Sequence, residues 1–264
     1  AKAWMNKELQ PLYIQMPNTN GLAVLRVSLV DSAGTVLNRN FCSFVVENAD
    51  EEKQPNQHLV TFAPGSFSKT EWSKKQWDVL DGLKINGAGY GYYEYNIPWP
   101  DNVMPEDVEG AVLRFEASAK QLYGKDIAEG EELRGDYMTG GGEHDPSRNP
   151  NAYPMTDETL FPSRVRVLVG GQTVNTFLLP DDPADHRGIL SWFSQLKDRK
   201  LREAGSYGYL ISAAISADQL QQAAKKGEIT IRLQVDKAFP GGLALYGNRF
   251  GRYPMDPTLV IMTQ

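Results

Sequence analysis

Aromatic side chains are concentrated in one stretch of the sequence, and their type and spacing suggest a chemical role. A sugar ring presents a face of C–H bonds that stacks on an aromatic plane, while its hydroxyl groups need amide, carboxylate or guanidinium partners. A stretch so rich in rings therefore favours a carbohydrate-binding surface. The rings of this stretch are Trp72, Trp77, Tyr90, Tyr92, Tyr93, Tyr95 and Trp99.

Two sets of side chains are the candidates for direct sugar contact. If Tyr90–Tyr95 is extended, alternate residues point into the core, so at most half of its rings can meet a ligand. Arg249 and Arg252 are as well suited to pairing with acidic loops as to binding a sugar. The expected stacking rings are Trp72, Trp77, Tyr90 and Trp192. The expected polar contacts are Asn86, Arg187, Arg249 and Arg252.

A cluster of carboxylates suggests one metal. Asp181, Asp182 and Asp185 stand beside prolines and His186, and hard oxygen donors on such a turn could hold calcium. Aspartates next to prolines are also simply good turn formers, which is the competing interpretation. No other cofactor is predicted.

The sequence argues against three other kinds of site, because the residues that each requires do not occur at the required spacing. Gly87–Gly91 superficially resembles a nucleotide loop, but Tyr92–Ile97 continues as strand rather than opening a helix. Pro64–Phe67 lacks the second glycine of a serine-hydrolase elbow. The histidines are too widely separated to form a zinc-ligand pair on one element, which argues against a catalytic zinc. They are His58, His144 and His186.

Composition and net charge exclude further classes of binding partner. The chain has 264 residues, of which 41% are hydrophobic and 23% charged, with 24 glycines and 16 prolines, as expected of a turn-rich globular protein. A formal net charge of -6 offers no basic field to nucleic acid. We find no signal-peptide pattern and no stretch of about 18 apolar residues, so we expect a soluble protein without a membrane partner. The single cysteine, Cys42, is expected to be a buried small hydrophobe.

Alternation of apolar and polar residues predicts an all-β fold. Ile229–Val235 and Leu113–Ser118 have the period of half-buried strands. Val165–Val169 and Gln172–Leu179 flank Gly170-Gly171, which predicts a hairpin. The strands predicted over 22–30 and 36–46 form a second hairpin around the turn-forming residues 31–34.

Helical patterns are scarce and do not alternate with strands. Ser216 is expected to cap a short helix over 217–226 that stops at Gly227, and Ser191–Ala204 is expected to form another. We therefore predict an antiparallel β-sandwich with short connecting helices and a jelly-roll, galactose-binding-like texture.

A polar run at Glu47–Asn56 suggests a domain boundary. Residues 1–48 are interpreted as the tail of an immunoglobulin-like β domain, and residues 57–264 as a β-sandwich module. The competing interpretation places all strands in one sandwich. Two long stretches, 124–162 and 179–187, are expected to be functional or disordered loops. The abrupt start suggests a fragment of a longer polypeptide.

Several segments together resemble the C-terminal region of large bacterial glycoside hydrolase family 2 proteins, and the resemblance covers most of the chain. They are Phe161–Ser163, Val165–Val169, Leu179–Gly188, Gly205–Tyr209 and Tyr246–Tyr253. In that family the active site lies in a TIM barrel, and no eightfold βα pattern occurs here. The resemblance therefore implies an accessory module without catalytic activity of its own, attached in cis to a catalytic domain and located in the periplasm or outside the cell.

The leading hypothesis is a non-catalytic carbohydrate-binding module that holds a glycoside hydrolase near a polysaccharide or oligosaccharide. A second hypothesis is a structural accessory domain that packs on the catalytic barrel, which predicts an exposed apolar patch. A third is a jelly-roll polysaccharide lyase or hydrolase, which would release products on its own.

Overall fold

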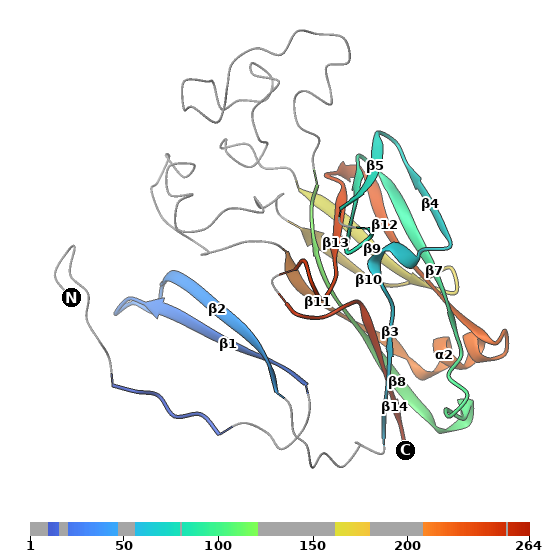
Figure 1. The fold of residues 1–264 in the computed structure, drawn as a ribbon, viewed down its shortest axis with the longest axis horizontal. Coiled ribbons are helices and arrows are strands. Elements are labelled where there is room, and N and C mark those ends of the chain that lie inside the picture. The colour runs from blue at the N-terminus through green and yellow to red at the C-terminus, as the bar shows by residue number, and fades with distance from the viewer. Residues whose placement is uncertain are drawn as a thin grey trace, which may run out of the picture.

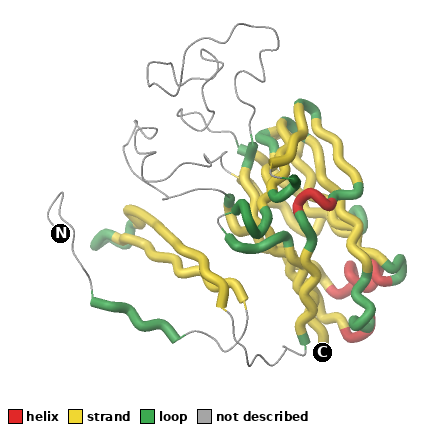
Figure 2. Tube along the Cα trace, viewed as in Figure 1, coloured by secondary structure: helices red, strands yellow, loops and turns green. Residues whose placement is uncertain are grey.

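Two antiparallel β-sheets pack face to face in the computed structural model of this chain, and a separate hairpin precedes them in sequence (Figure 1). Strands account for most of the described residues, as the tube in Figure 2 shows. The predicted all-β sandwich with short helices is therefore confirmed. For residues 21, 22 and 36–45 only the backbone is described. The structure describes residues 10–15, 21–46, 56–79, 81–120, 162–179, 208–251 and 253–264.

The first hairpin consists of β1 (Gly21–Val30) and β2 (Val36–Val46), as predicted. Asp31 closes its turn, because Oδ1 accepts the backbone N–H groups of Ala33 and Thr35 at 2.8 and 2.9 Å. Within the described ranges, these two strands pair with each other and with no other strand. Residues 47–55 lie outside the description, so the domain boundary and the immunoglobulin-like tail stay predictions.

The five-stranded sheet has the order β10-β9-β12-β7-β4. One of its faces lines the core, because the alternation in β12 places Ile229, Ile231, Leu233 and Val235 at 0–2% exposure. Burying each such side chain stabilises the fold by about 1.5–3 kcal/mol. Its strands are β4 (Lys69–Trp72), β7 (Gly91–Pro98), β9 (Ser163–Val169), β10 (Gln172–Leu179) and β12 (Glu228–Pro240).

The seven-stranded sheet is organised around β8. On one side β8 pairs with β11 along its length, and on the other side β14 and β13 lie end to end against it. β14 also pairs with β3, and β13 continues through β6 to β5. Its strands are β3 (Gln57–Thr61), β5 (Lys75–Val79), β6 (Lys84–Ala88), β8 (Val108–Ser118), β11 (Tyr209–Ser216), β13 (Leu243–Tyr246) and β14 (Thr258–Thr263).

Turn chemistry agrees with the sequence at two places. Gly170 and Gly171 both have positive φ, 57° and 86°, as a tight hairpin turn between β9 and β10 requires. The helix α2 (Ala217–Ala224) begins after Ser216, whose backbone N–H donates to Gln219 Oε1 at 3.2 Å. It ends two residues earlier than predicted.

Short 3-10 turns at Pro64–Ser66 and Pro105–Asp107 complete the described elements. The helix predicted over 191–204 lies outside the described residues. No described helix is long and apolar enough to cross a bilayer.

Candidate carbohydrate-binding groove

A row of polar and aromatic side chains crosses the outer face of the five-stranded sheet. Glu71 pairs in register with Tyr92, Tyr92 with Gln234, Gln234 with Arg166, and Arg166 with Thr176. Residues directly opposite each other in antiparallel strands point to the same face. Because Tyr93 and Tyr95 point into the core, this row points outward. We call it the open row.

The next row along the same face is satisfied internally. Arg232 Nε donates to Glu94 Oε2 at 2.7 Å, and Lys69 Nζ stands 3.4 Å from Glu94 Oε1. The same strands, β4, β7 and β12, supply both rows. No such bond joins the side chains of the open row to one another in the described part of the chain. We call Lys69, Glu94 and Arg232 the paired row.

The open row forms one wall of a groove of about 510 Å³ at the edge where β4, β7 and β12 meet their loops. Tyr90, which directly precedes β7, and Lys237, which lies in β12 beyond the residues paired with β7, also line the groove. The lining therefore combines two phenol rings with an amide, two carboxylates and two cations. These are the group types that stack on a sugar and bind its hydroxyls.

Tyr90 is held by the loop that follows β4. Its backbone N–H donates to Ser73 Oγ at 2.9 Å, and the Ser73 N–H donates to the Tyr90 carbonyl at 2.9 Å. Gly89 has a φ of 84°, and a Cβ there would lie 2.2 Å from Ser73 Oγ, so glycine permits this close approach. The Tyr90 side chain is 40% exposed, with Lys237 Nζ 4.9 Å from its ring centroid.

Tyr92 is the second ring of the groove. The Arg232 guanidinium carbon lies 4.1 Å from its centroid, so the paired row fixes this ring through a cation–π contact. The alternation expected for Tyr90–Tyr95 is seen here: Tyr92 is half-buried on the outer face while Tyr93 and Tyr95 are sealed inside. Burial raises the pKa of both inner phenols, and Tyr95 donates to the Pro64 carbonyl at 2.7 Å.

Trp72 does not lie in the groove, although it follows Glu71. Its ring packs inward against Tyr93, at 4.9 Å between centroids, and occupies the space left by two glycines. A Cβ on Gly87 would lie only 2.0 Å from Trp72 Cε2. Gly91 is crowded by the same residue. Trp72 was expected to stack on a sugar, but its ring fills the space that these glycines leave.

Trp77 and Asn86 are paired in register on the other sheet, away from the groove. Trp77 is half-buried, and Asn86 is 1% exposed with an Oδ1 that accepts no hydrogen bond. Asn86 is therefore sealed where no sugar hydroxyl can reach it, contrary to its expected role. Arg249 is exposed in the turn after β13. Trp192, Arg187, Arg252, Asp181, Asp182 and Asp185 lie outside the described residues.

The polar side chains that line the groove were not predicted from the sequence. Arg166 and Gln234 occupy the polar positions of two alternating strands, but alternation does not reveal which strands are neighbours. Glu71 belongs to a strand too short to be recognised. Only Tyr90 was among the expected contacts.

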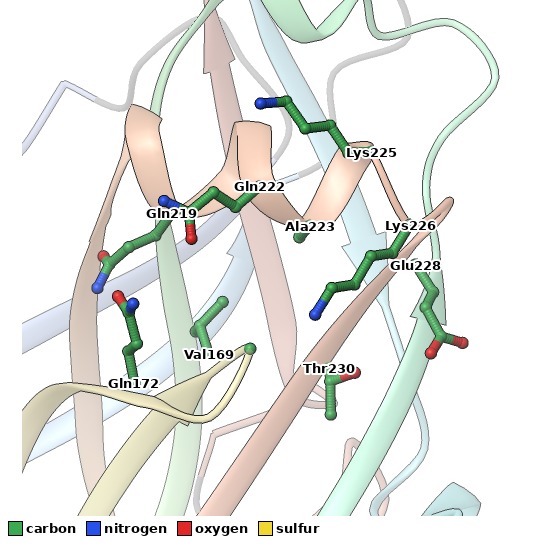
Figure 3. A pocket seen from close by; sticks show the side chains of 10 residues that line it. Val169, Gln172, Gln219, Gln222, Ala223, Lys225, Lys226, Glu228 and Thr230 are labelled. Carbon is green, nitrogen blue, oxygen red and sulfur yellow. The ribbon is translucent and has the colours of Figure 1, made fainter.

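A second hollow, of about 270 Å³, lies between α2, the β9–β10 turn and β12. Figure 3 shows Gln172 and Gln219 on facing sides of it, with Lys225 and Lys226 at the end of the helix. Gln219 is already engaged in capping α2. No aromatic ring lines this hollow, so it lacks a stacking platform. Among the described residues, no group of three or more histidine, cysteine, aspartate or glutamate residues could hold a metal ion.

Comparison with known proteins finds no family model and no curated protein that matches the sequence. A solved CBM36-1 domain of a multidomain xylanase, from the hindgut metagenome of Trinervitermes trinervoides, has 12% identity and a TM-score of 0.32, covering 79% of this chain and 98% of that one. A carbohydrate-binding module CBM36 in complex with calcium and xylotriose has 10% identity and a TM-score of 0.29, covering 76% and 97%.

Proposed function

We propose that this chain is a non-catalytic carbohydrate-binding module and that an oligosaccharide or polysaccharide binds in the groove beside Tyr90. The observation that carries the proposal is an exposed ring beside the open row, whose side chains are not bonded to one another in the described ranges. Tyr90 supplies the stacking surface, and the open row supplies hydrogen-bond donors and acceptors across the strands. Attachment to a glycoside hydrolase belongs to the proposal, because tethering would raise the effective concentration of a weakly bound enzyme.

The experiment is calorimetric titration of the purified chain with a panel of neutral and acidic oligosaccharides. Removing the Tyr90 ring takes away a stacking contact of about 0.5–1.5 kcal/mol, so Tyr90→Ala should weaken binding about 2- to 13-fold. Tyr13→Ala is the matched control, because Tyr13 is a 91% exposed tyrosine outside the sandwich. Loss of binding in both variants, or in neither, would contradict the proposal.

The alternative of a structural accessory domain requires a contiguous apolar face. The exposed large apolar side chains of the described sandwich come from both sheets and from loops, and do not define one face. They are Leu59, Tyr90, Met104, Leu178 and Leu210. The calcium hypothesis depends on Asp181, Asp182 and Asp185, and titration with and without a chelator tests it separately.

A further inference from the structure

The cations on the outer face of the five-stranded sheet differ in whether they have acidic partners. Arg232 and Lys69 share Glu94, and Arg164 lies 3.5 Å from Asp236 Oδ2. Arg166 lies between these pairs. Its side chain makes no hydrogen bond or ion pair within the described part of the chain, and its Nε is buried without a partner. The residue as a whole is half-buried and lines the groove, so an acceptor on a ligand there would be a favourable partner for its guanidinium.

We infer that the groove binds a saccharide carrying a carboxylate, with Arg166 as the residue that receives it. This inference rests on the function proposed above. A guanidinium offers two parallel donors to a carboxylate, whereas a neutral hydroxyl can use only one of them. The unpaired Arg166 is therefore better matched by a uronic acid than by a neutral sugar.

The acidic residues of the groove do not oppose this assignment. Glu71 is at the far end of the open row, three strand spacings or about 14 Å from Arg166 along the sheet. Asp236 is already engaged, since Oδ1 accepts the Ala238 N–H at 2.8 Å and Oδ2 faces Arg164. The charges of the open row are thus separated, which orients a ligand with its carboxylate toward β9.

The test is titration with uronate-containing oligosaccharides and with the carboxyl-reduced form of each, at fixed ionic strength. Wild-type protein should prefer the acid form. Arg166→Gln should weaken binding of the acid about 10- to 100-fold and leave binding of the reduced form within about twofold. Arg166→Lys should restore part of the preference, because it returns the charge without the fork. Arg114→Gln, an exposed arginine of the other sheet, is the matched control.

The outcomes separate this inference from the proposed function. If acid and reduced forms bind wild-type protein equally, or if Arg166→Gln keeps the preference, the inference is wrong while sugar binding stands. A stronger preference for a sulfated neutral sugar over the uronate would also overturn it. If neither form of any oligosaccharide binds, the proposed function itself fails. Thermal unfolding of each variant confirms that it folds.

Discussion

The two outer faces of the sandwich carry the same kinds of side chain but differ in what covers them. On the seven-stranded sheet, Lys84, Glu116 and Tyr246 are at most 1% exposed. On the five-stranded sheet, Arg166 and Tyr92 remain half-buried and line a groove. Cations, acids and tyrosines therefore become a structural cluster on one face and a candidate binding surface on the other. The difference comes from the connections that cross each face.

The covered face is closed in part by the segment that follows β13. Glu116 accepts the backbone N–H groups of Gly208 and Tyr253 at 2.7 and 2.9 Å, and Ser118 Oγ lies 3.1 Å from the Tyr246 hydroxyl. Lys84 Nζ stands 4.5 Å from the Tyr246 ring centroid. Polar groups buried this deeply must find partners inside the protein, and here backbone amides provide them.

The largest expected effect is on the covered face. Glu116→Ala should lower the free energy of unfolding by about 3–5 kcal/mol, because it leaves buried donors without their charged acceptor. Glu71→Ala, the matched change on the open row, should alter it by less than about 0.5 kcal/mol. Urea denaturation of both variants measures the difference. Equal losses in the free energy of unfolding would contradict the proposed difference between the two faces.

An intermediate effect is expected within the open face itself. Glu94 is 6% exposed and anchors both cations of the paired row. Glu94→Gln should therefore lower the free energy of unfolding by about 1–2 kcal/mol, and it should weaken sugar binding slightly by loosening Arg232 over Tyr92. Urea denaturation and titration of the same variant test both effects. No change in stability would mean that the two rows are equivalent.

The smallest expected effect is that of removing Trp77, on the seven-stranded sheet, on oligosaccharide binding. Trp77→Ala should leave oligosaccharide affinity within about twofold of wild type, since Trp77 shares no register position with the groove. Tyr90→Ala, titrated with the same ligand, gives the comparison. A larger loss from Trp77→Ala than from Tyr90→Ala would move the binding site to the seven-stranded sheet.

Periodicity allowed the strands to be predicted but not their neighbours. The alternation in β12 and the glycine pair after β9 depend on local residues, and both were predicted. The open row joins β4, β7, β12 and β9, which are far apart in sequence, so only tertiary pairing creates it. The inward packing of Trp72 could not be predicted for the same reason, because Gly87 and Gly91, which make room for its ring, lie on other strands. The burial of Asn86 could not be predicted either, because it depends on segments distant in sequence that cover this face.

The position of β14 has a consequence for how the molecule assembles. Among the described strands, β3 pairs with β14 alone. The hydroxyls of Thr61 and Thr258, which are 197 positions apart, lie 3.2 Å from each other. Closing so long a loop is entropically demanding, and contacts of this range slow folding. During synthesis, β3 must therefore wait, with its edge unpaired, until nearly all of the sandwich has left the ribosome.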